Sequence, residues 1–485
     1  MSKKNWFVVS LLALIIILAG IVRAWGIDMS SMQMDEYFHI ATAQSILEGH
    51  GGEVFREGHP RIYMRAFLLT LIITPFQAVA PEFAAIPSIL FSLISIVLIY
   101  LIGSKFSKSV GLIAAYAFAF STLAVAMGSY IRGYSLFVMM QLALVYALMQ
   151  IDWSLKGKYS YPDKWFRVAT ILALPSLYFL ADPRSTFTST IVILLAVPVF
   201  FVWHNLRCLK YVLPISAAIL AIGFAIVGTV GRLGGQEHVN LYPIYNSEFL
   251  GYFFSGLHTI DIPWISLLFT PFFLLGIATL LRSKDQSLKL ISVVTFTFLV
   301  FYGFYFNRYF EERYIYYLIP FALITFAVGV ESLAKKVATN RLATALIIFP
   351  ILILMLLPFF PNPRENATEI KQEKIEFQEP FFTIQNYNLK VDEQTAFITS
   401  HQFVLAYYFD LFKSDRLYSF DQRVPDFSAD NRKVLQEYEQ GYVVVERAWR
   451  TDAVTKANPE FSGVQLCDIA SDSTYIIKGW GRSCD

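Results

Sequence analysis

Two consecutive stretches near the N-terminus decide the fold: FVVSLLALIIILAGIV (Phe7–Val22) and SSMQMDEYFH (Ser30–His39). The first belongs to an apolar run over residues 6–27, which is long enough to cross a bilayer as a helix. The second places the carboxylate pair Asp35-Glu36 just beyond that helix, at a membrane surface. Carboxylates there cost solvation free energy unless they have water, partners or a chemical task. We therefore expect chemistry in the loop that this pair opens, which also holds His39, His50, Arg56, His59, Arg61 and Arg65.

Composition assigns the chain to the helical membrane proteins. Hydrophobic residues make up 56% of the sequence and charged residues only 16%, and the mean hydropathy is +0.51. Soluble globular domains do not need so much apolar surface. The first apolar run lacks a small-x-small cleavage site and continues directly into the acidic loop, so we interpret it as an uncleaved helix rather than a signal peptide.

Apolar runs of spanning length recur up to about residue 360. They cover residues 6–27, 83–104, 110–128, 135–151, 166–181, 186–204, 211–230, 263–281, 288–306, 314–333 and 341–360. A shorter run, 66–80, contains Pro75. The Lys and Arg residues between spans share the cytoplasmic side with Lys3 and Lys4 only if 66–80 does not cross. We therefore predict about eleven spans over residues 1–360, with 66–80 as an interfacial or re-entrant helix.

This topology predicts a multi-pass protein of the plasma or inner membrane, with a cytoplasmic N-terminus and an extracytoplasmic C-terminus. The segments expected outside are the loop 28–82, the turns 127–134, 181–185 and 307–313, and the loop 231–262. Because the acidic, histidine and aromatic residues of the loops concentrate in these segments, we expect the active face outside.

Beyond residue 360 the long apolar runs stop, and residues 361–485 are predicted to form a soluble extracytoplasmic α/β domain. Residues 395–400 and 441–446 have the pattern of buried strands, and 402–412 and 430–440 that of amphipathic helices. Cys467 and Cys484 both lie here. They form either a disulfide, if the domain is extracytoplasmic, or two unpaired thiols.

Several short motifs follow the Asp35-Glu36 pair in a definite order. They are Gly58-His-Pro, Arg132-Gly-Tyr134 and the late Arg308-Tyr…Pro320. With the topology, this order resembles the GT-C membrane glycosyltransferases, and most of all the protein O-mannosyltransferases and the aminoarabinose transferases that modify lipid A. The resemblance covers about residues 1–360.

The resemblance implies a catalytic site at the outer membrane face. Asp35 would be the catalytic carboxylate and Glu36 would orient the acceptor or hold its basic partners. The donor would be a polyprenyl-phosphate-linked sugar, and attack at its anomeric carbon would proceed with inversion. A departing phosphodiester needs fixed cations and hydrogen-bond donors. Candidates for this binding are His59, Arg61, Tyr63, Arg132, Tyr134, Arg308 and Arg313, with Arg65 as a further cation.

The sequence also departs from that family. His59, followed by the single Pro60, replaces the lysine and double proline of aminoarabinose transferases, and residues 127–134 hold no second acidic residue. For Asp35 and Glu36 the alternative is capping of the following helix. For the arginines it is membrane anchoring or internal ion pairs, as with Glu311 and Glu312 beside Arg308 and Arg313.

Other classes of protein remain as alternatives. One is a lipid or small-solute transporter or flippase, another an O-antigen ligase or polymerase, and a third a structural or receptor protein. Under the transferase hypothesis the partners are the bilayer, the lipid-linked donor and a glycan, lipid or protein acceptor. We expect no nucleic acid partner and no cofactor, and no metal, because no His-x-x-His, Asp-x-Asp or Glu-x-x-His spacing is present.

Overall fold

The computed structural model divides the chain into two compact units. One comprises 1–27, 55–76 and 82–376; the other comprises 28–54, 77–81 and 377–485. We call them the helical unit and the sheet unit. The residues described are 3–27, 36, 39–40, 43, 46–47, 49, 74–76, 81–150, 193, 263–305, 315–337, 348–353, 356, 358, 362, 366, 389–399, 416–419, 434–446, 460–461, 464–471 and 475–484.

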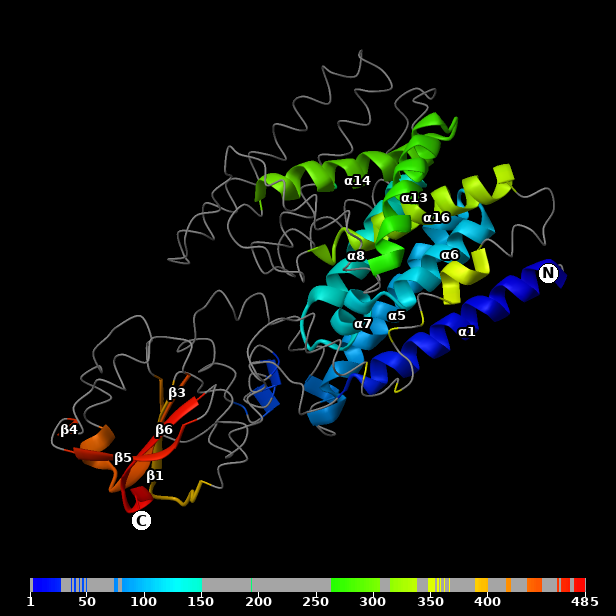
Figure 1. Cartoon of the computed structure of the whole chain (residues 1–485). Coiled ribbons are helices and arrows are strands. Elements are labelled where there is room, and N and C mark those ends of the chain that lie inside the picture. Colours follow the sequence, from blue (N-terminus) through cyan, green and yellow to red (C-terminus); the bar gives the residue numbers. More distant parts are fainter. Residues whose placement is uncertain are drawn as a thin grey trace, which may run out of the picture. The chain divides into compact units, whose positions relative to one another are not determined.

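The helical unit is built from apolar helices packed side by side. Figure 1 shows α1 next to α5 and α6, with α13, α14 and α16 above them in that view. Their bounds are α1 (Lys3–Trp25), the 3₁₀ turn η2 (Pro81–Ala85), α5 (Ile86–Ser104), α6 (Lys108–Ala119), α7 (Thr122–Ser129), α8 (Tyr134–Met149), α13 (Pro263–Arg282), α14 (Gln286–Tyr305) and α16 (Ile319–Val337).

Two of the predicted spans are confirmed as helices long and apolar enough to cross a membrane. Within the described part of the chain these helices are Trp6–Trp25 and Phe83–Ser104. The run 110–128 differs, because it forms two helices, α6 and α7, bent by 63° across a short break. The pair is either one broken span or a re-entrant loop. The break falls at Phe120 and Ser121, where Ser121 takes an extended N-cap conformation ahead of α7.

The remaining predicted spans are covered unevenly. Helix α8 corresponds to 135–151, α13 to 263–281 and α14 to 288–306, whereas the helix expected from residue 314 begins only at Ile319. Runs 166–181, 186–204, 211–230, 341–360 and 66–80 lie largely outside the described residues. Of the positions described in them, Ile193, 348–353 and 74–76 are α-helical, whereas Leu356 is in a turn and Pro358 is in a 3₁₀ conformation. The number of spans therefore stays a prediction.

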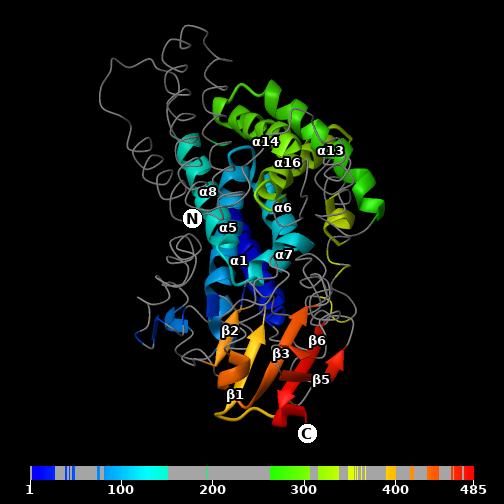
Figure 2. The same cartoon turned by 90° about the vertical axis from the view of Figure 1, so that its left-hand side faces the viewer.

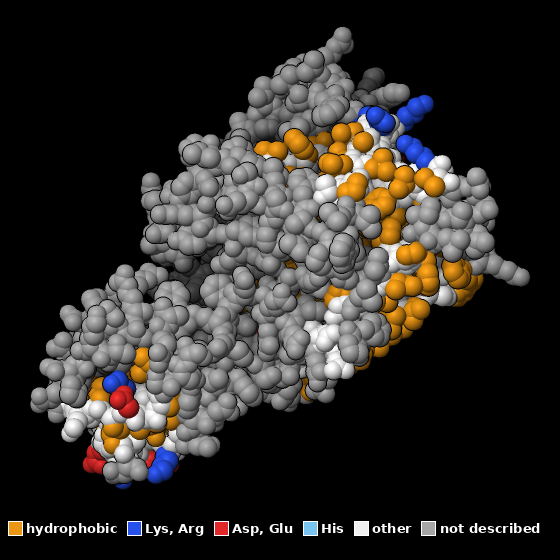
Figure 3. Space-filling model, viewed as in Figure 1, with side chains coloured by type: hydrophobic (Ala, Val, Ile, Leu, Met, Phe, Trp, Pro, Cys, Tyr) orange, Lys and Arg blue, Asp and Glu red, His pale blue; other side chains and the backbone are white. Residues whose placement is uncertain are grey.

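Helices α13 and α16 approach each other at Gly276 and Gly329. A Cβ on Gly276 would lie 1.9 Å from the carbonyl oxygen of Thr325, and one on Gly329 would lie 1.8 Å from that of Phe272. Small residues that let two backbones touch are a common basis of helix association in membranes. Figure 3 shows the apolar side chains that cover the described helices, with Lys and Arg side chains at one end.

Polar contacts gather three chain segments at one end of the helical unit. Ser107, the N-cap of α6, donates to a carboxylate oxygen of Glu331 on α16 over 2.7 Å. Lys105 donates to Gln150, just past α8, over 2.9 Å. Lys335 pairs with Glu331 at 3.1 Å. The connection 105–108 and the C-terminal ends of α8 and α16 thus lie together, as the charge sorting predicts for loops on one membrane side.

The sheet unit contains one mixed sheet in the order β2-β1-β3-β6-β5-β4, visible as arrows in Figure 2. The pairs β1–β2 and β1–β3 are parallel, and β3–β6, β6–β5 and β5–β4 are antiparallel. The strands are β1 (Thr395–Thr399), β2 (Leu417–Ser419), β3 (Gln440–Glu446), β4 (Glu460–Phe461), β5 (Val464–Ser471) and β6 (Tyr475–Gly481).

Most sequence predictions that fall on the described part of the sheet unit are confirmed. The predicted strands 395–400 and 441–446 correspond to β1 and β3. The helix expected over 430–440 is helical only at 434–437 among its described residues, and its end was wrong: Gln440 already belongs to β3. The helix predicted over 402–412 lies outside the described residues. Cys467 and Cys484 form the disulfide, with their Cα atoms 5.8 Å apart.

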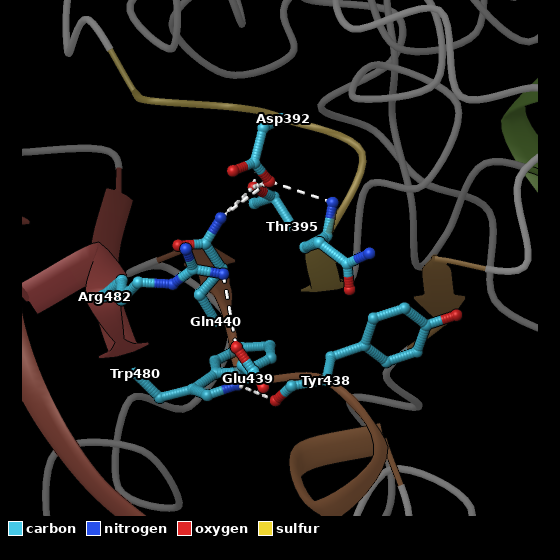
Figure 4. A network of polar contacts seen from close by, with 8 residues as sticks. Asp392, Thr395, Tyr438, Glu439, Gln440, Trp480 and Arg482 are labelled. Atoms are coloured by element: carbon cyan, nitrogen blue, oxygen red, sulfur yellow. Dashed lines mark hydrogen bonds and ion pairs between the residues drawn. The ribbon is translucent and has the colours of Figure 1, made fainter.

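The loop before β1 is fixed by a carboxylate that accepts several hydrogen bonds. Asp392 accepts from the Thr395 hydroxyl at 2.7 Å, the Gln394 backbone N–H at 2.9 Å and the Gln440 side-chain amide at 2.6 Å. Figure 4 shows these contacts at the edge where β1 and β3 begin. They hold the pKa of the exposed Asp392 carboxyl below its usual value, with the Thr395 hydroxyl as the main cause. These hydrogen bonds fix the backbone where both strands begin.

Candidate functional site

The segment after the first span is described at a few positions, which form one face of a helix. Glu36, His39, Ile40 and Ala43 are helical and buried, at the i, i+3, i+4, i+7 spacing of an amphipathic helix. Leu47, on the next turn, is 47% exposed. Glu36 is therefore a helical residue whose side chain is buried rather than solvated. Asp35 lies outside the described residues.

A second part of the candidate site is the turn between α7 and α8. Arg132 is half-buried here, and its guanidinium lies 5.9 Å from the centre of the Tyr134 ring. One of its terminal nitrogens donates to the Tyr134 hydroxyl over 3.4 Å. The structure thus brings together Arg132 and Tyr134, two of the predicted donor-binding residues. Cation–π contact and hydrogen bond both restrict where this guanidinium points.

The turn is anchored to the surrounding helices. Ser88 on α5 donates to the carbonyl oxygen of Arg132 over 3.4 Å. Ser135 at the start of α8 donates to the carbonyl oxygen of Met127 on α7 over 2.9 Å. These bonds join α5, α7 and α8 around the turn. The backbone that carries Arg132 is therefore held by three helices and does not project as a free loop.

Tyrosines pack beneath the same turn. The ring of Tyr134 lies 6.0 Å from that of Tyr130 and 6.0 Å from that of Tyr317, just before α16. The Phe137 ring meets that of Tyr317 edge-on at 5.1 Å. Aromatic pairs at these distances stabilise beyond their buried area. This cluster fixes Tyr134 by packing, since its side chain is almost fully buried.

Sequence reasoning missed a fully buried charge in the described helices, Arg23 near the end of α1. Its side chain has no solvent exposure. Its Nε donates to the Ser92 hydroxyl over 2.8 Å. Its terminal nitrogens donate to the carbonyl oxygens of Ala19, Phe118, Ala119 and Ala124 at 3.2, 3.4, 2.9 and 3.3 Å. A guanidinium has five N–H donors, and these five hydrogen bonds engage all of them.

Gly128 on α7 leaves the space that Arg23 occupies. A Cβ at this position would lie 2.5 Å from Arg23 Nε and 3.0 Å from the Ser92 hydroxyl oxygen. A signal for Arg23 was present in the sequence. If Lys3 and Lys4 lie inside, as the sequence predicts, a cation at the far end of the first span departs from the positive-inside pattern, which marks it as a candidate for buried partners.

The other predicted site residues, His59, Arg61, Tyr63, Arg308 and Arg313, lie outside the described residues, as does Arg65. Within the described part of the chain no group of three or more His, Cys, Asp or Glu residues has the arrangement of a metal site. The candidate residues that the structure describes fall into two separate groups, one in each unit: Glu36 and His39 on a helix face of the sheet unit, and Arg132 and Tyr134 at the turn of the helical unit.

Together, the apolar helices, with the bent pair α6 and α7 among them, and the small mixed sheet define an integral membrane protein with a C-terminal α/β unit. No family model and no curated protein matches the sequence. Solved structures do match. ArnT from Cupriavidus metallidurans in the apo state aligns with a TM-score of 0.60 and 11% identity, covering 99% of this chain and 98% of that chain.

The same protein bound to undecaprenyl phosphate aligns with a TM-score of 0.56 and 10% identity, over 99% of this chain and 98% of that one. The Archaeoglobus fulgidus oligosaccharyltransferase in complex with Zn and sulfate aligns with a TM-score of 0.48 and 11% identity, covering 89% of this chain and 68% of that chain. The two ArnT structures carry the fold argument. The GT-C resemblance predicted from the sequence is confirmed at the level of the fold, and it extends past residue 360 into the sheet unit.

Proposed function

We propose that this chain is an inverting membrane glycosyltransferase that moves a sugar from a polyprenyl-phosphate donor to an acceptor at the outer membrane face. The observation that carries the proposal is the ArnT-like fold over 99% of the chain, including an ArnT structure bound to undecaprenyl phosphate. The order of Asp35-Glu36, Gly58-His-Pro and Arg132-Gly-Tyr134 along the sequence supports it independently.

In the proposed reaction an acceptor hydroxyl or amine attacks the anomeric carbon of the donor sugar. A bond forms between the acceptor and that carbon while the bond from the carbon to the phosphate oxygen breaks, and the lipid phosphate leaves with the electron pair. Asp35 takes the proton of the acceptor, as a general base does. Glu36, buried on the helix that follows, orients the acceptor or the basic side chains around it.

The departing phosphate is held by cations and hydrogen-bond donors. Arg132 is the described candidate, because its guanidinium is half-buried and fixed against Tyr134. His59, Arg61, Tyr63, Arg308 and Arg313 are proposed to complete this binding site. Fixed guanidinium donors stabilise the charge that develops on a leaving phosphodiester.

The proposal is tested by replacing Asp35 with Asn, which keeps the size of the side chain and removes its charge and basicity. Release of polyprenyl phosphate from a polyprenyl-phosphate sugar, with a cell-envelope extract supplying the acceptor, should fall by about 10²–10⁴-fold. Donor affinity should change little. Asn is nearly as good a helix N-cap as Asp, so a capping role predicts equal rates for both proteins.

A matched control is Asp468→Asn, which makes the same chemical change at an exposed carboxylate on β5. It should leave the rate unchanged. A transporter or flippase predicts that the wild-type protein releases no polyprenyl phosphate at all while moving the intact lipid across vesicle membranes. That result, or equal rates for the wild type and Asp35→Asn, would overturn the catalytic proposal.

A further inference from the structure

The break between α6 and α7 leaves backbone carbonyl groups without their usual helical partners. The last carbonyl groups of any helix have no intrahelical donor, and in an apolar domain water does not replace it. Phe118 and Ala119 are the last two residues of α6, and their carbonyl groups accept hydrogen bonds from Arg23. The side chain thus caps a helix that ends inside the apolar helix bundle.

Arg23 also ties the helix beyond the break to the rest of the unit. It donates to the carbonyl oxygen of Ala124 on α7 and to Ser92 on α5. Gly128 of α7 lies against the guanidinium so closely that it has no room for a side chain. Helix α7 therefore rests on Arg23 both by hydrogen bonding and by contact.

The position of α7 determines where Arg132 lies. Only the turn 130–133 separates α7 from α8. Ser135 bonds back to Met127 on α7, and Ser88, one helical turn before Ser92 on α5, holds the Arg132 carbonyl group. A swing of α7 about the break would move one anchor of this turn relative to the other.

We propose that Arg23 is a positioning residue: by capping α6 and holding α7 at the break between the two helices, it fixes the turn that presents Arg132. The consequence for catalysis rests on the proposed function, in which Arg132 binds the donor phosphate. Arg23 itself is not a phosphate ligand in this arrangement, because all five of its N–H donors are engaged.

The chemistry of the site favours arginine over lysine. The planar guanidinium reaches carbonyl groups on α1, α6 and α7 at the same time, whereas an ammonium group has three donors in a compact cluster. A buried cation in a membrane domain is costly and therefore marks a function or an essential partner set. Lysine at position 23 should serve some of these acceptors and leave others unpaired.

A disulfide trap measures the position of α7 without any activity assay. The ideal Cβ of Gly26, after α1, would lie 3.5 Å from the Cβ of Ser129 at the end of α7, within the range that a disulfide requires. Gly26→Cys with Ser129→Cys, in a Cys208→Ser full-length chain, should therefore cross-link rapidly under mild oxidation. Mass spectrometry of the linked peptides gives the rate, and the single-cysteine chains are controls.

Adding Arg23→Met to this pair should slow cross-linking by roughly tenfold or more, because the permitted disulfide geometry is narrow. Arg23→Lys should give an intermediate rate. The cross-linking rates of the Arg23→Met and Arg23→Lys chains are compared only in protein that elutes as a folded species. An unchanged rate for Arg23→Met in such protein overturns the inference, because α7 then keeps its place without the guanidinium.

A double-mutant cycle tests the consequence for the donor. Arg23→Met and Arg132→Ala should each raise the KM for the polyprenyl-phosphate sugar, and together they should raise it no further than Arg132→Ala alone. Effects that multiply would overturn action through Arg132. If the wild type shows no transfer while cross-linking still depends on Arg23, the proposed function fails and the positioning role of Arg23 stands.

Discussion

The helical unit and the sheet unit each contain a charged side chain that is held mainly by dipoles. In the helical unit Arg23 donates to one hydroxyl and four backbone carbonyl groups. In the sheet unit Asp392 accepts from one hydroxyl, one backbone N–H and one side-chain amide. The two sites use the same kind of bond, but Arg23 has no exposure to solvent and Asp392 is exposed.

This difference in burial determines how much stability the protein should lose when each site is disturbed. An unsatisfied charge in an apolar interior is far more costly than one that water can reach. The set of partners around Arg23 must therefore be complete, whereas Asp392 can exchange a partner for water. Glu331, buried at the Lys-rich end of the helical unit and paired with the exposed Lys335, lies between these extremes. Substitutions should follow this order.

The largest effect is expected at Gly128, which contacts Arg23. Gly128→Leu forces a side chain into a position where even a Cβ lies 2.5 Å from the guanidinium. Either Arg23 loses its acceptors or α7 moves away, so stability should fall by about 3 kcal/mol or more. Thermal unfolding in detergent measures it.

Gly20→Ala is the matched control for Gly128→Leu, because its Cβ would meet only Leu93 at an ordinary 3.6 Å. It should be neutral or stabilising by up to about 1 kcal/mol, since alanine favours a helix interior. Equal effects of the two glycine substitutions would contradict the idea that the Arg23 site is distinguished by its close approach.

A smaller effect is expected at the other end of the same unit. Glu331→Gln keeps an oxygen that accepts from Ser107 but removes the ion pair with Lys335. The loss of stability should be about 1 kcal/mol. The difference from wild type should shrink as salt concentration rises, because one partner is 61% exposed.

Lys335→Met provides the comparison for Glu331→Gln. It removes only the exposed partner, and Ser107 continues to donate to the carboxylate. Because the buried carboxylate of Glu331 is then left charged without its cation, the loss of stability should equal or exceed that of Glu331→Gln. A salt-independent loss for Glu331→Gln would show that the Ser107 bond, and not the ion pair, accounts for the stability of this end.

The sequence predicts what depends on the average character of a segment. Spans 6–27 and 83–104 follow from apolar length, and strands β1 and β3 from short buried runs. The Cys467–Cys484 bridge follows from the presence of both cysteines in one predicted extracytoplasmic domain. These features need no knowledge of particular neighbours, and the structure confirms them.

What depends on particular neighbours was not predictable in the same way. The run 110–128 contains neither proline nor a charge at its break, and its one signal is the pair Ser121-Thr122, residues that favour helix starts. The break is stable because Arg23, about a hundred residues away in sequence, supplies donors there. Of the candidate site, the Arg132–Tyr134 contact follows from local spacing, whereas Asp35 as the catalytic base remains a prediction.

The smallest effect is expected for Asp392→Asn, and it should appear only in acid. The hydrogen bonds to the carboxylate lower the pKa of Asp392 below its usual value of 3.8. The folded state therefore prefers the ionised form. Its contribution to stability is fully present above about pH 4 and is lost as the pH falls through the lowered pKa.

Asp392→Asn removes this titration, so the variant should lose less stability than wild type between pH 5 and pH 3. Hydrogen exchange of peptides from 389–399 in the full-length protein reports on the turn directly, because Gln394 donates its backbone N–H to this carboxylate. At neutral pH exchange should be only slightly faster in the variant, since water can replace a lost bond at an exposed site. If acid accelerated exchange equally in both proteins, the turn would be held by Thr395 and Gln440 without the charge, and the parallel between Asp392 and Arg23 would fail.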